Sequence, residues 1–180
     1  MTLSKEESTL FFKLWLPLLR FSSEAYNLHV DALTNHLGGI DFAAAINVAE
    51  NIWSDVSIID EYLSLRKDMT DEEREIISGW KRVIHAPFAI ERHLRGGSVF
   101  ISLEDSRVYL VKGITSSYQE MFGNRPMPVI ATASLLPFKG IIITDGLLQV
   151  SDAIVGPNYT SGFKDVYMTA KQEKKIIKSL

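Results

Sequence analysis

The spacing of apolar residues changes near His85, and this change constrains the fold more than any other feature of the sequence. Before His85, apolar residues recur every three or four positions, which is the period of an amphipathic helix. Along Phe88–Leu94 the period is instead two, because Phe88, Ile90, Arg92 and Leu94 alternate with Ala89, Glu91 and His93. A period of two is typical of a strand. We therefore predict an α+β domain with a helical bundle over residues 1–85 and a strand-rich part over residues 86–156. A terminal helix is expected over residues 163–180.

Two pairs of polar residues and one single aspartate predict helix starts. Thr70 and Glu73, and likewise Ser117 and Glu120, have the spacing of a capping box, in which two side chains satisfy backbone amides at a helix start. Asp41 is a candidate cap of the same kind. In the helices predicted over residues 42–84, apolar residues recur at helical spacing, and we expect them to be buried. They are Phe42, Ile46, Ala49, Trp53, Ile58, Ile59, Tyr62, Leu63, Ile76, Ile77, Trp80, Val83 and Ile84.

The first helix contains a proline. Pro17 lies inside an apolar stripe that includes Trp15, and a proline cannot donate to the carbonyl group four residues before it. We therefore expect a kink or a break near Trp15. A second helix is predicted between Ser23 and Leu37, closed by Gly38–Gly39.

Turn residues divide the second half into short apolar runs. Gly96–Gly97 separates the first two runs, Glu104–Ser106 is typical of a hairpin loop, and Asp145–Gly146 is a strong hairpin signal. The run Val129–Leu136 is apolar enough to be a strand buried on both faces. Because the connections are short, we predict an antiparallel meander sheet or a small open barrel of about five or six strands.

The chain contains no cysteine. This excludes disulfides, thiolate metal sites and cysteine nucleophiles, and it removes the usual sign of an oxidising compartment. We therefore expect a cytoplasmic protein. The apolar stretch Leu10–Phe21 is interrupted by Lys13 and Arg20 and is shorter than the roughly 20 residues that span a membrane, so we predict no membrane association.

Charge is unevenly distributed. Residues 41–75 carry ten acidic and three basic side chains, whereas residues 163–180 carry five lysines, Asp165 and Glu173. A solvated acidic helix face and a lysine-rich terminal helix explain this pattern. The alternative is a basic end that contacts nucleic acid or anionic lipid, but the isoelectric point of about 5.8 argues against nucleic acid.

Motifs that carry phosphate, zinc or acyl-transfer chemistry are missing from the sequence, so we predict no cofactor, no metal site and no catalytic residue. His29 and His36 share one face of the predicted second helix. They are seven residues apart, whereas two histidines that bind one metal ion are more often three or four apart.

Five residues of the strand-rich part are candidate contacts with a ligand or partner. Arg92 and His93 form a polar pair inside a strand, so one of them faces whatever the sheet packs on. Either Arg92 is a surface arginine and His93 a hydrogen-bonded histidine, or one of them is a contact inside a concave face of the sheet. Phe138 and Lys139 lie at a turn that would expose an aromatic ring beside a cation. Asp145 has a structural explanation in its Asp-Gly turn.

A longer pattern runs through the same half of the chain. It comprises SGWK at 78–81, FAIERHL at 88–94, VFI at 99–101, VYLVKGI at 108–114 and LLPFKGIIITDGLL at 135–148. These motifs resemble an uncharacterised family of Firmicutes-type bacteria whose last motif is close to LLPFKGxIIYDGLL. The resemblance covers about residues 53–171 and implies no established activity, cofactor or catalytic residue. Thr144 stands where the family usually has tyrosine, and VGPN at 155–158 replaces a more glycine-rich stretch.

Three hypotheses for the function remain open. The first is a non-catalytic binding module of the bacterial cytoplasm that meets a protein partner at the rim of the sheet near Lys139 and Arg92. The second is a small hydrolase or transferase whose site is assembled by the fold from residues such as His93, Asp145 and Lys139. The third and weakest is association with nucleic acid through the strands and the lysine-rich end.

Overall fold

The computed structural model describes residues 1–28, 41–153 and 155–180. They form two compact units, one of residues 6–81 and one of residues 1–5 with 82–180. The predicted α+β class is confirmed. The predicted helix between Ser23 and Leu37 and the pair His29 and His36 fall largely on 29–40, outside the described residues.

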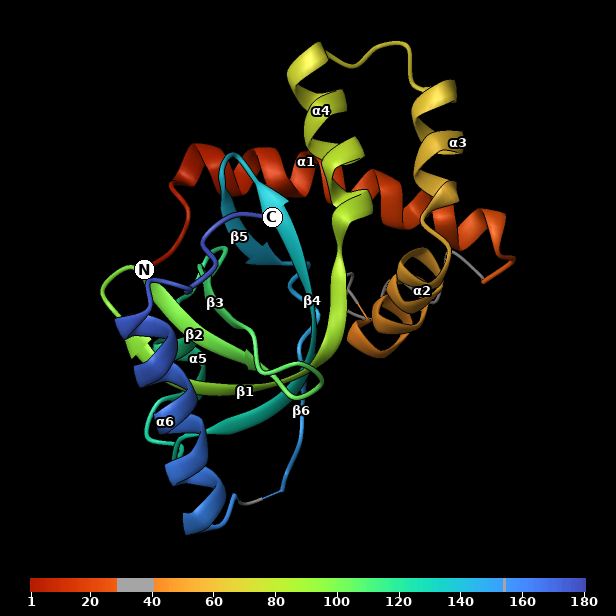
Figure 1. The fold of residues 1–180 in the computed structure, drawn as a ribbon. Coiled ribbons are helices and arrows are strands. Elements are labelled where there is room, and N and C mark those ends of the chain that lie inside the picture. Colours follow the sequence, from red (N-terminus) through yellow and green to blue (C-terminus); the bar gives the residue numbers. More distant parts are fainter. Residues whose placement is uncertain (29–40, 154) are drawn as a thin grey trace. The chain divides into compact units, whose positions relative to one another are not determined.

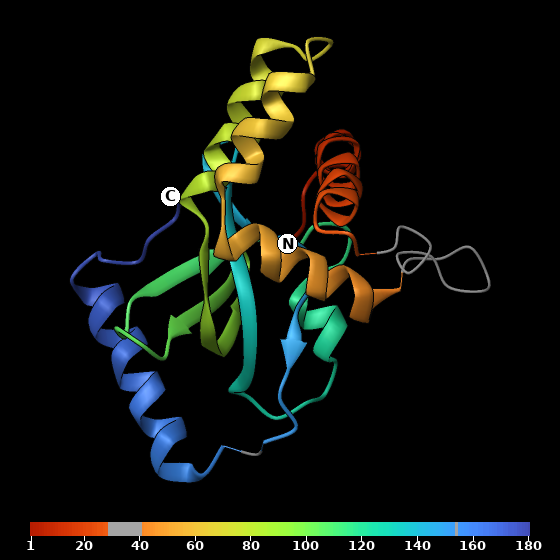
Figure 2. The same ribbon diagram turned by 90° about the vertical axis from the view of Figure 1, so that its right-hand side faces the viewer.

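The unit of residues 6–81 is helical. Its helices are α1 (Lys5–Ala25), α2 (Phe42–Ser54), α3 (Ser57–Leu65) and α4 (Asp71–Gly79), followed by a short 3-10 turn, Trp80–Arg82. Helices α3 and α4 lie side by side as a hairpin (Figure 2).

Helix α1 runs past Pro17 without a break, so of the two expectations, a kink or a break near Trp15, the break is wrong. A proline inside a helix costs about 3 kcal/mol. Each large apolar side chain that is fully buried contributes about 1.5–3 kcal/mol, so the apolar stripe of α1 outweighs the proline. The buried residues of that stripe are Phe11, Leu14, Trp15, Leu18 and Leu19.

Aromatic rings form the core of this unit. Trp15 of α1 stacks on Trp53 of α2 with ring centres 5.3 Å apart and planes 5° apart. Trp80 meets Trp15 edge to face at 5.9 Å, and it meets Phe11 at the same distance. The prediction that these tryptophans are core residues is confirmed.

The predicted helix starts are confirmed by hydrogen bonds. The Asp41 carboxylate accepts the amides of Ala43 and Ala44, which begins α2. Thr70 and Glu73 form the capping box of α4. The buried side of α2 differs from the prediction, because its buried residues are Ala45, Val48, Ala49, Ile52 and Trp53.

Phe42 was predicted to be buried, and this is wrong, since 64% of the residue is exposed. It is the first residue of α2 and projects from the capped end of the helix, one turn before the buried stripe begins.

The second unit contains a six-stranded sheet with two helices. The elements are β1 (Ile84–Leu94), β2 (Gly97–Ser102), β3 (Val108–Val111), α5 (Tyr118–Phe122), β4 (Val129–Phe138), β5 (Ile141–Thr144), β6 (Gln149–Val150) and α6 (Pro157–Gln172). The first strand begins at Ile84, so the predicted helical positions of Val83 and Ile84 are wrong. Ser117 and Glu120 form the predicted capping box of α5.

The sheet curls because β1 pairs with both β2 and β4 (Figure 1). The strand order is β1-β2-β3-β5-β4-β6, and all pairings except one are antiparallel. The exception is a parallel contact between β3 and β5 at Val111 and Ile142. The sheet is therefore mixed and not a closed barrel, which corrects the expectation of a purely antiparallel meander.

The Asp145–Gly146 turn does not connect two paired strands, so the predicted hairpin is wrong. Strand β6 pairs with Ala131 and Thr132 of β4 instead of with β5. The backbone at Gly146 has a φ of 85°, a left-handed conformation that glycine adopts without strain. After this turn the chain pairs with the first half of the long strand β4, whereas β5 pairs with its second half.

Each face of the curled sheet has its own apolar cluster. The inner cluster contains Ala86, Phe88, Ile90, Phe100, Tyr109, Val111, Tyr118, Val129, Ala131, Ala133, Leu135 and Ile142. The outer cluster contains Ala89, Val99, Ile101, Val108 and Tyr167, and partly buried residues of α6 pack against it. Helix α6 therefore covers the outer face of β1, β2 and β3 (Figure 1).

The predicted terminal helix has different bounds. Helix α6 begins at Pro157, six residues before the predicted start, and ends at Gln172. The chain beyond it returns to the sheet, where Ile177 bonds with Val108 and Leu110 of β3. No helix within the described ranges is both long and apolar enough to cross a membrane.

Candidate functional site

Arg92 and His93 point to opposite faces of the sheet, as predicted, but a bulge decides which face each one takes. Ile90 pairs with Phe100, whereas Arg92 pairs with Val99, so Glu91 is an extra residue in the ladder. An extra residue reverses the alternation that follows it. Arg92 therefore lies on the outer face together with Val99.

Arg92 has a structural role at this position. Its guanidinium lies over the ring of Tyr167 in α6, 4.3 Å from the ring centre, and it forms an ion pair with Glu91. The hydrogen bond from Arg92 to Glu91 raises the pKa of the guanidinium. The side chain is thus held between β1 and α6.

His93 faces the inner side, where its ring stacks on Phe122 of α5 at 6.2 Å. Its Nδ1 atom lies 2.8 Å from Oγ of Ser98 on β2. Burial lowers the pKa of His93 below its ordinary value of 6.5, and the positive N-terminus lowers it further. A neutral imidazole beside a serine hydroxyl has the composition of a general base and a nucleophile, but Ser98 is only 4% exposed.

Lys139 occupies a two-residue turn between β4 and β5. Phe138 pairs with Ile141 across it, and the φ angles of Lys139 and Gly140 are 49° and 78°. Two central residues with positive φ are typical of the type I′ turn that favours tight hairpins. Phe138 is buried, so the expected patch of exposed ring and cation does not form.

Asp145 is buried, and the residue before it, Thr144, contacts Tyr118 through its hydroxyl group. Its carboxylate accepts the amide of Leu147 at 3.0 Å. The hydroxyl groups of Tyr118 and Thr144 lie 2.9 Å apart, and the Thr144 oxygen accepts the amide of Gly146. Burial raises the pKa of the Tyr118 hydroxyl well above its ordinary range. This arrangement explains Asp145 as a turn residue.

The five candidate residues are not brought together. The β1–β4 ladder runs from Ile84, which pairs with Leu135, to Ile90. Arg92 lies beyond Ile90, whereas Lys139 lies beyond Leu135 at the opposite end. The rim near Lys139 and Arg92 is therefore not one surface.

Asp145 and Lys139 are also separated, because they lie at opposite ends of β5. The second hypothesis named these two residues with His93 as members of one catalytic site. That arrangement does not form.

A different surface is concave. A groove of about 440 Å³ runs between α6 and the β2–β3 turn. Its apolar lining includes Val108 of β3 and Val166 and Ala170 of α6, which belong to or pack against the outer cluster.

Four of the five charged side chains that line this groove form two ion pairs, and the fifth, Asp165, has no ion-pair partner among the described residues. Asp105 bonds with Arg107 at 3.2 Å, and Glu173 bonds with Lys175 at 2.7 Å. The rim is therefore close to neutral around an apolar floor.

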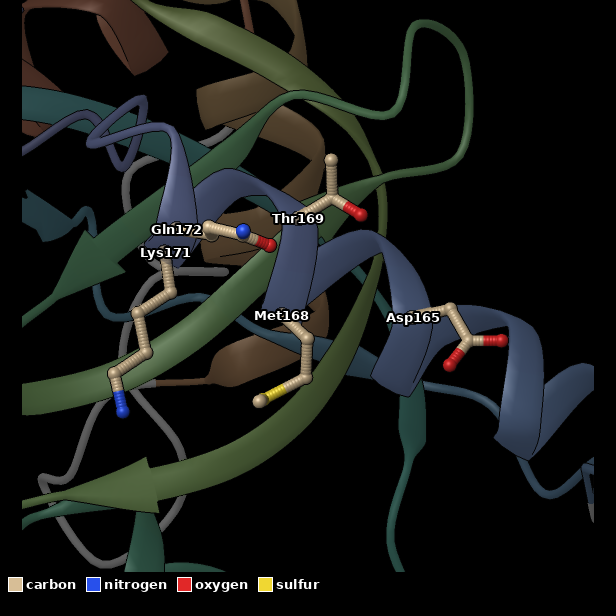
Figure 3. A pocket seen from close by; sticks show the side chains of 5 residues that line it. All are labelled: Asp165, Met168, Thr169, Lys171 and Gln172. Atoms are coloured by element: carbon tan, nitrogen blue, oxygen red, sulfur yellow. The ribbon is translucent and has the colours of Figure 1, made fainter.

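A second hollow, of about 600 Å³, lies along α6 itself (Figure 3). We call the surface that lines it the α6 face; it consists of Asp165, Met168, Thr169, Lys171 and Gln172. Met168 lies between Asp165 and Lys171 along the helix (Figure 3), and 47% of this methionine is exposed. Asp165 and Thr169 line the groove as well, so the two concave surfaces are continuous.

The sequence did not single out the α6 face. The spacing of Asp165, Met168 and Lys171 was visible, but such a pattern occurs on many exposed helices. Only the fold shows that these residues flank a groove.

Within the described part of the chain, no group of three or more histidine, aspartate or glutamate side chains is placed to hold a metal ion. The chain matches no protein-family model, and no curated protein or solved structure is significantly similar to it. The resemblance to the bacterial family therefore stays a prediction from the motifs.

Proposed function

We propose that this chain is a non-catalytic interaction module that binds another protein through the α6 face and the adjoining groove. The observation that carries the proposal is the continuity of two concave surfaces along α6, with the exposed side chain of Met168 in one and an apolar floor in the other. Exposed apolar side chains in a depression with a polar rim are typical of protein-binding surfaces.

The charges favour a protein over a nucleic acid. Asp105, Asp165 and Glu173 line the groove together with Arg107 and Lys175, so it has no excess of basic side chains to neutralise a phosphate backbone. Asp105 and Glu173 are already paired with basic neighbours, so an apolar segment of a protein can cover the floor of the groove while these two carboxylates keep their partners. The cytoplasm stays the predicted compartment for this interaction.

Small organic probes test the proposal without knowledge of the partner. Isopropanol and phenol are titrated into the ¹⁵N-labelled full chain, and amide shifts are mapped. We expect the largest shifts along residues 165–172 and 106–108, and smaller ones there in Met168→Lys. Met121→Lys is the matched control, because Met121 is similarly exposed, at 55%, on α5. Largest shifts elsewhere in the chain would reject the α6 face as a docking surface.

A hydrolase or transferase is a second candidate, supported by the contact between His93 and Ser98. If the pair acts as base and nucleophile, the chain cleaves an activated ester such as p-nitrophenyl acetate, and Ser98→Ala abolishes the cleavage. Equal rates for both proteins would leave the pair as a hydrogen bond between strands.

A further inference from the structure

We infer that the partner at the α6 face is a second copy of this chain, with the two α6 helices packed antiparallel. This inference rests on the proposed function, because it names the occupant of the same face. It is carried by the arrangement of Asp165, Met168 and Lys171, which complements itself.

Met168 is the midpoint of this arrangement. Asp165 precedes it by three residues and Lys171 follows it by three, so the two charges lie about 9 Å apart along the helix. Residues three apart lie on the same side of a helix. Figure 3 shows both charged side chains flanking Met168.

A two-fold axis through Met168 brings opposite charges together. In an antiparallel pair with that axis, Asp165 of each copy lies opposite Lys171 of the other copy. The two Met168 side chains meet at the axis and are withdrawn from water. Such an interface uses the same patch on both copies, as closed two-fold dimers do.

The same register places no like charges opposite each other within the helices. Lys164, which lies on the same side of α6, falls opposite Gln172 of the second copy. Asp165 and Lys171 form no ion pair or hydrogen bond through their side chains with any described residue, so both are available to the second copy.

The dimer should be weak and sensitive to salt. A stable interface buries about 800 Å² on each partner, which is more than one side of a short helix supplies. Its ion pairs are exposed, so raising the salt concentration to about 1 M, where charges are screened beyond about 3 Å, should shift the equilibrium toward monomer.

Charge reversal tests the pairing by sedimentation equilibrium, at chain concentrations up to about 1 mM, near the weak limit of specific association. Asp165→Lys alone, or Lys171→Asp alone, opposes like charges at both contacts and should weaken dimerisation by about tenfold or more. A 1:1 mixture of these two variants restores both attractive pairs and should associate. The double variant D165K/K171D should dimerise by itself, while Lys67→Asp, a change of the same kind at an exposed position between α3 and α4, should behave as the unaltered chain.

Rescue in the mixture and in the double variant would establish the antiparallel register. An unaltered chain that stays monomeric up to about 1 mM would overturn the second copy as partner. A dimer that is indifferent to the reversals would overturn it too. If the organic probes shift amides on the α6 face but the chain is monomeric, the proposed function stands and the partner is a different protein. If the probes shift amides elsewhere, the result counts against the proposed function itself.

Discussion

The guanidinium of Arg92 lies 4.3 Å from the centre of the Tyr167 ring, and this contact fastens α6 to β1. Tyr167 is buried in the outer cluster, so the contact lies between the helix and the sheet, whereas the next residue, Met168, is exposed. The surface proposed to bind a partner therefore depends on how firmly the sheet holds α6.

Replacing Arg92 should loosen this attachment. Arg92→Met keeps much of the apolar stem but removes the cation over Tyr167 and leaves the Glu91 carboxylate without its ion pair. We expect a loss of about 1–2 kcal/mol in unfolding free energy and faster hydrogen exchange along α6. Arg107→Met is the control, because Arg107 is largely exposed and should change stability by less than about 0.5 kcal/mol. Equal losses would contradict this role.

Two glycines should respond to alanine with opposite signs. An added methyl group would meet no atom within 4 Å at Gly140 or at Gly162. The difference is the backbone, since Gly140 has a φ of 78° and Gly162 lies inside α6. Gly140→Ala should lower the unfolding free energy by about 1 kcal/mol, and Gly162→Ala should raise it by about 0.5–1 kcal/mol. Chemical denaturation measures both, and a gain at Gly140 would contradict the assigned turn.

The imidazole of His93 should titrate below its ordinary pKa of 6.5, because burial lowers its pKa. Between the lowered pKa and 6.5 the unfolded chain binds more protons than the folded chain, so stability falls as the pH decreases below 6.5. His93→Gln should remove this part of the decline. NMR titration of the ring protons gives the midpoint directly, and Phe122→Ala should move it upward by exposing the ring. A midpoint at or above 6.5 would show that the ring is not buried as described.

The capping box of α4 should make stability depend on pH in the acid range. A hydrogen bond from Lys13, at 2.5 Å, and one from the Thr70 amide lower the pKa of Glu73 below its ordinary 4.5. The charged carboxylate thus stabilises the folded chain above pH 4.5, and this contribution is lost as the pH falls through the lowered pKa.

Glu73→Gln tests this dependence. The variant should be less stable than the unaltered chain at about pH 7, and the difference should shrink at about pH 3. Glu75→Gln, on the exposed side of the same helix, should differ little from the unaltered chain at either pH. A difference for Glu73→Gln that stays constant across this range would contradict a stabilising charge.

Local hydrogen bonds were the part of the fold that sequence reasoning predicted best. The capping boxes at Thr70 and Ser117 depend on residues three positions apart, so their spacing alone identifies them. The start of α6 was missed although Pro157 stands at its first turn, a favoured place for proline. The apolar stripe becomes dense only near Phe163, where the helix reaches the sheet.

Contacts between distant residues could not be predicted in this way. The extra residue Glu91 reverses the faces of Arg92 and His93, and nothing in the sequence distinguishes a bulge from regular alternation. The strand after Asp145 pairs with β4 instead of β5. This pairing is possible because β4 is long enough to accept both strands, and the residues of the turn do not reveal that length. For the same reason the α6 face could be found only once the fold had placed a groove beside α6.

A single cysteine at position 168 tests most directly whether a second copy binds at the α6 face, because the chain has no cysteine of its own. In the inferred dimer the two copies meet at Met168, and helices that pack closely bring facing side chains near the Cβ separation of about 3.5–4.5 Å that a disulfide requires. Met168→Cys and the control Met121→Cys are oxidised at equal concentration, and the covalent dimer is measured on a non-reducing gel. We predict rapid cross-linking at position 168, slowed by Asp165→Lys in the same chain, and slow cross-linking at position 121. Equal rates at the two positions would contradict a second copy at the α6 face.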